Sequence, residues 1–263
     1  MTLAMSAKSA EMKAAGEKVI NFGVGEPDFN TPENIIQAAK DAMDKGYTKY
    51  VAAAGLPALK KAVCEKFKRD NNLDYKPSQI VISNGGKHAI LNAVAAVVEE
   101  GDEVIIPSPY WLTYPEVVVF FGGVPKYVET SRENDFKMTA EQLEAAITPK
   151  TAMLIFNSPC NPTGAVYSEE EIKAIAAVCE KHELCVLSDE MYEKLVYDGL
   201  KHYSIAEVSP KMKELTILVN GVSKSYAMTG WRLGYLAAAE HVAKAIGSFQ
   251  SHATSNVNTI TQY

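Results

Sequence analysis

Two cations stand alone in "NGVSKSYAMTGWRLGY" (220–235), where Lys224 precedes Arg232 by eight positions and no other residue is charged. Lys224 follows an apolar, β-forming run at 215–219 that predicts a buried strand. Loops after the carboxyl ends of strands form the active sites of many α/β proteins. A lysine placed there can bind a carbonyl compound covalently, whereas a single loop lysine is more often simply solvated.

Two further loops have residues that suit a flat, phosphorylated ligand. "SNGGK" (83–87) reads as a strand end, two glycines and a helix start, and free N–H groups at a helix N-terminus bind phosphate. "PSPYW" (107–111) puts Trp111 just past another expected strand, where its face could cover a ring. Taken singly, the glycines fit an ordinary turn and Trp111 fits a packed core residue.

The loops "NSPCNPTG" (157–164) and "SDEMY" (188–192) add polar groups. The two prolines of the first fix Asn161 in place, unless this is a turn without a chemical role. Asp189 ends an expected strand, and a buried carboxylate needs a cationic or hydrogen-bonding partner unless it caps a helix. Together the five loops place a phosphate-binding turn, an aromatic ring, a carboxylate, a phenol and a lysine on one edge of the sheet. This combination is typical of a pyridoxal phosphate site.

The elements that must position these loops alternate between strand and helix. Thr31 followed by Pro32 predicts an N-cap and a first helical residue. The alternation favours an open, mostly parallel α/β sheet covered by helices on both faces. The expected strands include 80–83, 102–107, 124–128, 151–156 and 184–189, and a helix is expected over 87–98.

Composition narrows the class of protein. The 263 residues are 47% hydrophobic and 22% charged, and the net charge of −6 makes nucleic acid and membrane poor partners. Four cysteines without a regular framework favour a reducing cytoplasm, and five scattered histidines give no metal-site spacing. The first residues predict a helix that packs on something other than the sheet. The last ones, "SNVNTITQY", resemble a newly capped helix, so we expect further sequence beyond Tyr263.

The chain resembles the fold-type I pyridoxal phosphate-dependent aminotransferases, in the aspartate aminotransferase group that includes bacterial aspartate/prephenate enzymes. The matching stretches include "GVGEPDF", "GYTKYVAAAGLPALK", "SNGGKHAI", "PSPYWLTYP", "NSPCNPTGAVY", "SDEMYEKLVYDG" and "SKSYAMTGWRLGY", in family order from 23 to 235. The resemblance implies a homodimer that moves an amino group from an amino acid, aspartate being favoured, to 2-oxoglutarate. It also implies a large domain over 34–263 with a seven-stranded sheet, and a small domain that has its N-terminal part at 1–33 but lacks its C-terminal part.

The resemblance further implies roles for single residues. Lys224 would form the Schiff base with pyridoxal phosphate and then move the substrate proton. Asp189 would keep the ring nitrogen protonated, Tyr192 and Asn161 would bind the ring oxygen, and Trp111 would stack on the ring.

The phosphate would be held by Arg232 and the N–H groups of Gly86 and Lys87, with Gly85 and Ser223 also in the cofactor set. Tyr50 would reach the phosphate of the partner subunit. The backbone of Gly25 would meet the substrate carboxylate, and Trp111 and Asn161 would also contact substrate. No metal is implied.

Two positions depart from the family pattern. Many relatives carry Ser or Thr three positions before the lysine, where this chain has Gly221. Ser223 and Ser225 flank Lys224 instead. Cys160 interrupts the proline-asparagine loop, which favours a tolerated variant over a redox role.

Other functions stay open at this point. The same scaffold supports C–S lyases and cyclising synthases, and a folded but catalytically impaired cofactor-binding fragment is a further alternative. A nucleotide-binding module fails, because no GxGxxG follows a first strand. The chain has three arginines, Arg69, Arg132 and Arg232, and neither of the first two is expected to follow a strand on the site edge. We therefore expect weak cofactor binding and slow turnover.

Overall fold

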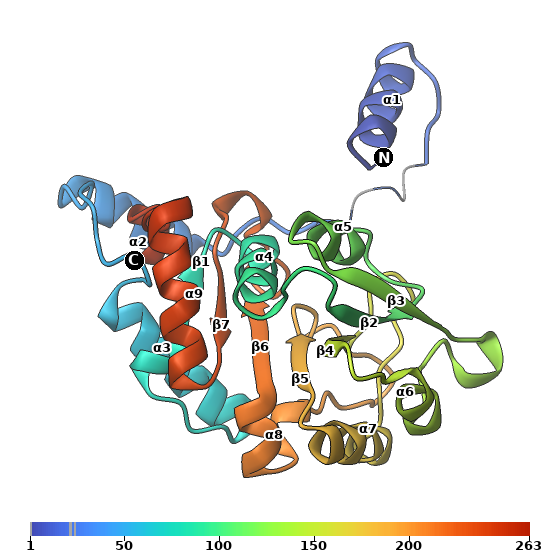
Figure 1. The fold of residues 1–263 in the computed structure, drawn as a ribbon. Coiled ribbons are helices and arrows are strands. Elements are labelled where there is room, and N and C mark those ends of the chain that lie inside the picture. The colour runs from blue at the N-terminus through green and yellow to red at the C-terminus, as the bar shows by residue number, and fades with distance from the viewer. Residues whose placement is uncertain (1, 21–22, 24) are drawn as a thin grey trace.

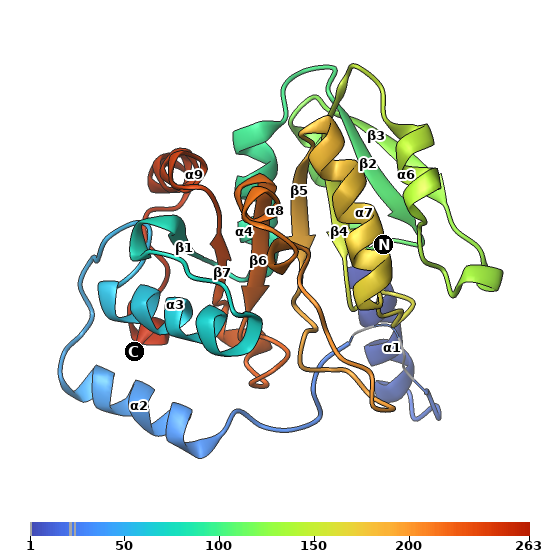
Figure 2. The same ribbon diagram turned by 90° about the horizontal axis from the view of Figure 1, so that it is seen from below.

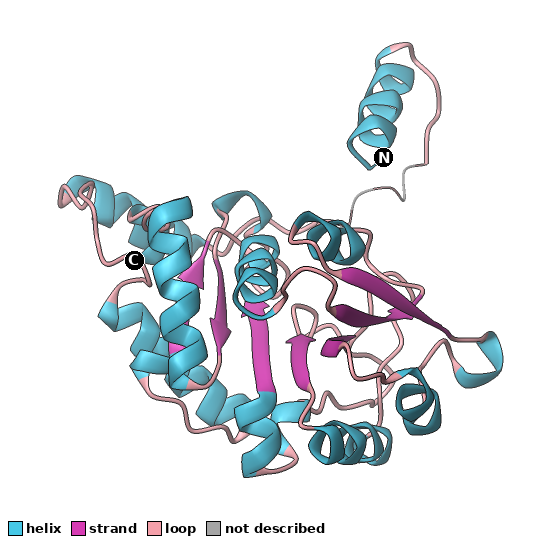
Figure 3. Ribbon diagram, viewed as in Figure 1, coloured by secondary structure: helices cyan, strands magenta, loops and turns pink. Residues whose placement is uncertain are grey.

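The fold is built around one sheet, which has its strands in the order β1-β7-β6-β5-β4-β2-β3 (Figures 1 and 3). The computed structural model describes residues 2–20, 23 and 25–263. β7 runs antiparallel to β1 and β6, and the other pairings are parallel. This confirms the predicted mostly parallel seven-stranded α/β sheet. The strands are β1 (Ile80–Ser83), β2 (Glu103–Ser108), β3 (Val124–Glu129), β4 (Thr151–Asn157), β5 (Cys185–Asp189), β6 (Thr216–Gly221) and β7 (Gly234–Ala237).

Helices cover both faces of the sheet because alternate strand residues point to opposite sides. Val104 and Ile106 of β2 pack under α4, α5 and α9, whereas Ile105 faces α6 and α7. Figure 2 shows the layer made by α3, α8, α7 and α6. The helices are α1 (Thr2–Ala14), α2 (Glu33–Asp44), α3 (Pro57–Asn71), α4 (Gly86–Val97), α5 (Thr113–Phe120), α6 (Ala140–Ala146), α7 (Glu169–His182), α8 (Pro210–Leu215) and α9 (Glu240–Ala253).

Helix α2 begins differently from the sequence prediction. Pro32 is the N-cap, without a side-chain capping bond, so the prediction of Thr31 as the cap was wrong. The hydroxyl of Thr31 donates to the carbonyl oxygen of Ala227 at 2.7 Å and accepts from Nε1 of Trp231 at 2.9 Å. The side chain of Thr31, which the local pattern predicts to cap the helix, instead forms long-range hydrogen bonds with the loop that carries Lys224.

The two ends of the chain lie in different surroundings. Figure 1 shows α1 apart from both helix layers, and no helix among the described residues is long and apolar enough to cross a membrane. The last residues do not open an α-helix as predicted: Ile260–Gln262 form a single 3₁₀ turn. Tyr263 stacks on Tyr47 with ring centres 4.4 Å apart, which holds this turn against the segment after α2. The division into 1–33 and 34–263 stays a prediction.

Gln250 of α9 ties three elements together from a fully buried position. Its Oε1 accepts bonds from Ser83 and Asn92, and its Nε2 donates to the carbonyls of Ala53 and Ile82. Two donors and two acceptor positions are all that a glutamine amide has, so the group is fully used. Gln250 therefore fixes α9 against β1 and α4, the two elements on either side of the glycine loop that is expected to bind phosphate.

Replacing Gln250 with Met should lower the free energy of unfolding by about 3 kcal/mol, because several buried polar groups lose their partner at once. Urea denaturation measures the change. Gln37→Met is the matched control, because Gln37 is exposed and its side-chain amide donates to Asp41 on its own helix. The control should change stability by less than about 0.5 kcal/mol. Equal losses in both variants would contradict the role given to Gln250.

Candidate active site

The loops after β1, β2, β4, β5 and β6 open on one edge of the sheet. The parallel pairings align β2, β4, β5 and β6, and two successive antiparallel pairings through β7 give β1 the same direction. The chain therefore brings most of the sequence-predicted residues to one edge. These are Gly85, Gly86, Lys87, Trp111, Asn161, Asp189, Tyr192, Ser223, Lys224 and Arg232.

Asp189, the last residue of β5, is a buried carboxylate with a side chain and a backbone group as its donors. The hydroxyl of Tyr114 donates to Oδ2 at 2.8 Å, and the N–H of Met191 donates to Oδ1 at 3.1 Å. Burial raises the pKa of Asp189 to about 6, although both hydrogen bonds act in the opposite direction. Within the described ranges no cationic side chain forms an ion pair with it.

Lys224 follows β6 and lies half-buried at the same edge. Its ammonium donates to the carbonyl of Gly25 and lies 5.9 Å from the ring centre of Tyr192. Burial lowers the pKa of Lys224, and the charge of Arg232 lowers it further, while Glu26 opposes the shift. An amine with a lowered pKa is a better nucleophile and proton carrier near neutral pH.

The N-terminal segment contacts the same lysine loop. Besides the bond from Lys224 to Gly25, the hydroxyl of Thr229 donates to Glu26 at 2.8 Å. With the two bonds of Thr31, these contacts place residues 25–31 against the loop. Gly25 is thus brought to the site, as predicted from sequence.

The loop after β4 faces the turn after β5. The amide of Asn161 donates to the hydroxyl of Tyr192 at 3.4 Å, so the two predicted ring-oxygen donors are neighbours. Asn157 orients this loop: its Oδ1 accepts from the N–H of Asn161, and its Nδ2 donates to the carbonyl of Asp189. Burial raises the pKa of Tyr192, and the nearby Asp189 adds to the shift, which keeps the phenol protonated.

An anion cradle lies between α4 and Arg232. The N–H groups of Gly86 and Lys87 begin α4, and among the described residues neither donates to another group. The Arg232 guanidinium donates to the carbonyls of Thr229 at 2.9 Å and Asn84 at 3.3 Å, which aims it at this helix end. A helix N-terminus beside a guanidinium binds phosphate well.

Glycine is required in this cradle for space. Gly85 has a φ of +83°, and a Cβ there would overlap the Arg232 guanidinium. A Cβ on Gly234 would lie 2.5 Å from the backbone of Gly85 and Gly86. The close approach of β7 to the cradle therefore depends on residues without side chains.

The unusual Gly221 has a steric explanation in this chain. A Cβ at this position would lie 3.1 Å from both Gly234 Cα and the Leu233 carbonyl oxygen, tighter than ordinary contacts. Of the two flanking serines, Ser223 is buried, and the buried Oγ of Ser225 has no partner in the described part of the chain. Ser225 is thus an orphaned hydroxyl beside Lys224.

Trp111 and Lys87 lie next to each other at the sheet edge that carries the site. The ammonium of Lys87 is 5.0 Å from the centre of the Trp111 ring. The ring of Trp111 packs against Tyr114 at 87° with centres 5.5 Å apart. The contact with Tyr114 fixes the orientation of the Trp111 ring, as expected for a side chain that covers a flat ligand ring.

Two predicted features lie away from this cluster. Tyr50 is 90% exposed. Arg69 pairs with the adjacent Asp70 at 2.8 Å, and Arg132 lies in a 3₁₀ turn between β3 and α6. Arg232 is the guanidinium whose hydrogen bonds place it beside the start of α4, whereas Arg132 follows β3, the outermost strand of the sheet.

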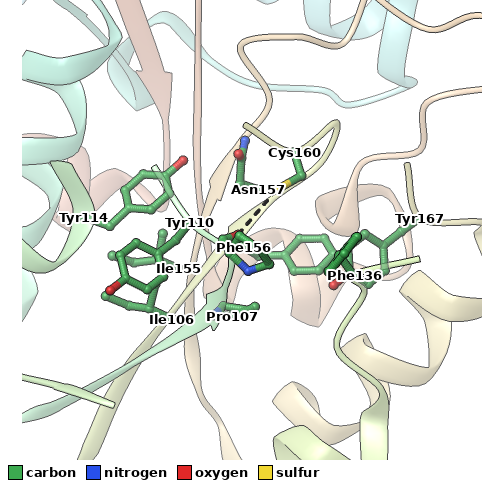
Figure 4. Close-up of a pocket in the computed structure, with 11 residues that line it drawn as sticks. Ile106, Pro107, Tyr110, Tyr114, Phe136, Ile155, Phe156, Asn157, Cys160 and Tyr167 are labelled. Carbon is green, nitrogen blue, oxygen red and sulfur yellow. Dashed lines mark hydrogen bonds between the residues drawn. The ribbon is translucent and has the colours of Figure 1, made fainter. Parts of the chain in front are cut away.

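Tyr114 is the site residue that sequence reasoning missed. It lies beside a cavity of about 20 Å³, room for about one water, which Figure 4 shows between the ends of β2 and β4. Asn157 and Cys160 line the same cavity. The available signal was the spacing of Tyr114 three positions after Trp111, which puts both on one side of a helical turn.

A second polar cluster lies directly behind the turn at 190–193. Ligand-type atoms of Glu190, Glu193 and His202 lie within 4.8 Å of one another. The ammonium of Lys66 is 2.6 Å from Glu193, and His202 is 2.9 Å from Glu190. Burial alone would lower the pKa of His202, but the Glu190 carboxylate raises it above its ordinary value. Glu193 therefore pairs with Lys66 and Glu190 with His202, and the cluster supports the turn that carries Tyr192.

The residues at the edge fit pyridoxal phosphate. The buried Asp189 carboxylate has no cation among the described residues, and a protonated ring nitrogen would supply one. The free N–H groups of α4 and the guanidinium of Arg232 suit the phosphate. The half-buried amine of Lys224 suits the covalent link.

Comparisons with known proteins agree with this geometry. Residues 17–263 match the family described as "Aminotransferase class I and II". Aspartate aminotransferase of Bacillus subtilis (strain 168) is 54% identical over 262 residues, 100% of this chain and 67% of that protein. Aspartate/prephenate aminotransferase of Cereibacter sphaeroides (strain ATCC 17029 / ATH 2.4.9) is 50% identical over 263 residues, 100% of this chain and 66% of that protein.

Solved structures give the same result. Aspartate aminotransferase from Thermus thermophilus with maleate has a TM-score of 0.96 and 45% identity, covering 99% of this chain and 67% of that one. The enzyme from Rhizobium meliloti has a TM-score of 0.95 and 46% identity, covering 99% and 65%. The chain spans about two thirds of the length of these relatives. With the matched family, the identities and the shared fold, the chain belongs to the class I and II aminotransferases, a family that depends on pyridoxal phosphate.

Proposed function

We propose that the protein is an aspartate aminotransferase, which moves the amino group of aspartate to 2-oxoglutarate with pyridoxal phosphate. The observation that carries this proposal is the buried carboxylate of Asp189 on the same sheet edge as the amine of Lys224. The relatives named above as aspartate or aspartate/prephenate aminotransferases support the choice of donor. When bound, pyridoxal phosphate supplies a carbonyl carbon that takes up an amino group and a ring that accepts an electron pair.

Asp189 and Lys224 have the central roles in this proposal. Ionised Asp189 holds a proton on the ring nitrogen, because a buried anion gains most from a cation at contact distance. Lys224 would hold the cofactor through its carbonyl carbon, and its amine would move the proton at the substrate Cα. Burial and Arg232 lower the pKa of Lys224, which favours the neutral amine that this step needs.

The neighbouring side chains bind and orient. Tyr192 and Asn161, already within hydrogen-bonding distance of each other, donate to the ring oxygen. Trp111 covers the ring, and Arg232 with the N–H groups that begin α4 holds the phosphate. Gly85 leaves room for this contact, and Ser223, which precedes Lys224, belongs to the proposed cofactor set.

Substrate would be bound by Gly25, Trp111 and Asn161. Arg232 is committed to the phosphate, Arg69 pairs with the adjacent Asp70, and Arg132 follows β3, the outermost strand of the sheet. A guanidinium fork is the best single ligand for a carboxylate. We therefore propose that this chain binds substrate weakly and turns it over slowly.

We also propose a cytoplasmic homodimer. The 90% exposed ring of Tyr50 is free to reach a partner's phosphate site. All four cysteines are free, which suits a reducing compartment.

The reaction class is tested by its products. Incubation of the cofactor-loaded chain with aspartate and 2-oxoglutarate should yield glutamate and oxaloacetate. A C–S lyase would instead release ammonia and pyruvate from a cysteine conjugate, and that result would contradict the proposal.

Lys224 should be the lysine that binds the cofactor covalently. Borohydride reduction of the loaded chain followed by peptide mass mapping should place a pyridoxyl group on Lys224. The adduct should disappear in Lys224→Ala and persist in Lys87→Ala, the other ammonium near the site. A modified lysine elsewhere in the wild-type chain would sink the assignment.

Asp189→Asn should slow abstraction of the substrate Cα proton by several orders of magnitude, because the ring nitrogen loses its anionic partner. Single-turnover kinetics measures the rate. Asp198→Asn, in an exposed turn at φ +58°, is the control and should leave the rate unchanged. A rate within about tenfold of wild type, roughly 1.4 kcal/mol of barrier, would show that Asp189 has another role.

The same substitution should stabilise the cofactor-free chain in a pH-dependent way. The pKa of Asp189 is raised from 3.8 to about 6 on folding, so wild-type stability falls as pH rises through this window. The Asn variant lacks this loss. Its advantage in unfolding free energy should therefore be up to about 3 kcal/mol larger at about pH 8 than at about pH 4. Denaturant titrations showing the same difference at both pH values would contradict the shift.

A further inference from the structure

Tyr114 is placed to control Asp189 rather than to touch the substrate. Its side chain is 2% exposed, and its hydroxyl is the side-chain donor to Asp189 in the described part of the chain. We propose that Tyr114 is a positioning residue that fixes the Asp189 carboxylate in one orientation and keeps it ionised for the ring nitrogen. This inference rests on the proposed function of the site.

The two oxygens of the carboxylate are held from two sides. Tyr114 donates to Oδ2 from α5, and the N–H of Met191 donates to Oδ1 from the turn after β5. Each carboxylate oxygen can accept two bonds. The plane of the group is therefore fixed while acceptor positions remain for a further donor, as a partner of a ring N–H requires.

The donor cannot itself lose its proton at working pH. Burial raises the pKa of Tyr114 well above its ordinary value, and the charge of Asp189 raises it further. The phenol therefore donates over the whole range in which Asp189 titrates. A histidine or an ammonium would add a charge that competes with the ring nitrogen, whereas a neutral phenol adds only the hydrogen bond.

Other ionisable groups lie around the pair formed by Tyr114 and Asp189. Tyr114 faces Asp189 from α5, Cys160 approaches Tyr114 from the loop after β4, and Glu190 and Tyr192 are on the same turn as Asp189. Glu190 is a like charge that raises the pKa of Asp189. With no cation among these groups, the hydroxyl of Tyr114 and the N–H of Met191 are what oppose protonation of the carboxylate.

Tyr114 also connects the carboxylate to the aromatic cover. The N–H of Tyr114 donates to the carbonyl of Trp111 at 3.0 Å, and the two rings meet edge to face. One short turn therefore carries both the side chain proposed to cover the ring and the donor to Asp189. The ring of Tyr114 borders the cavity shown in Figure 4. The contacts of Tyr114 with Trp111 and Asp189 hold this ring in position.

The test measures the pKa of Asp189 in the full chain by infrared difference spectroscopy, with Asp189→Asn identifying the carboxylate band. Tyr114→Phe should raise this pKa by about one unit, because a hydrogen bond to the charged form is lost. Tyr167→Phe is the matched control. Tyr167 is also buried and lines the same cavity, but its hydroxyl accepts from the N–H of Met138. The control should leave the pKa of Asp189 unchanged.

A second variant keeps the inference testable if Tyr114→Phe fails to fold. 3-Fluorotyrosine placed at position 114 is a stronger donor of nearly the same shape, and it should lower the pKa of Asp189. A purely structural role for Tyr114 would give no shift of opposite sign in the two variants. An unchanged pKa in either variant overturns the inference.

Failure of the inference and failure of the proposed function give different results. If borohydride places no adduct on Lys224 of the wild-type chain, the proposed function fails, and with it the premise of the inference. If the adduct forms normally and the pKa of Asp189 is unchanged by the substitutions at Tyr114, the inference alone fails. If the adduct forms and the pKa moves in the two expected directions, both stand.

Discussion

The Asp189 carboxylate, buried at the end of β5 without a cation among the described residues, is the constraint on which the site depends. An unpaired buried charge is costly, and the raised pKa of Asp189 reflects that cost. Two donors keep the group in place, and a cationic ring nitrogen would complete its shell. The structure thus tolerates a local loss of stability at the position where the cofactor needs a counter-charge.

The strand β7 explains how the remaining groups reach that carboxylate. Because β7 runs opposite to its two neighbours, the chain leaves β6, forms the loop with Lys224 and Arg232, and returns beside β1. Gly234 then lies against Gly85 and Gly86 with no room for a side chain. One reversed strand therefore brings the amine and the guanidinium to the phosphate cradle.

Much of this arrangement is predictable from sequence because it depends on local patterns. Apolar runs locate most strands, and residues just after them fall on one edge. Pairings between distant residues are not local and were missed. Nothing near Thr31 indicates that Ala227 and Trp231 take its hydroxyl, and nothing near Tyr114 indicates Asp189, which lies 75 residues away. The four-residue β7 is too short for a pattern to distinguish it from a turn.

The contacts of residues 25–31 with the lysine loop have a consequence for the order of folding. They join positions 196 to 203 residues apart, so they close some of the longest loops in the chain. Closing such a loop costs entropy that is recovered only once the sheet holding the lysine loop exists. The N-terminal segment therefore docks late, and by the same reasoning it is the first part of the site to leave when the protein opens. Partial unfolding would remove the substrate side of the site while the phosphate cradle and Asp189 stay intact.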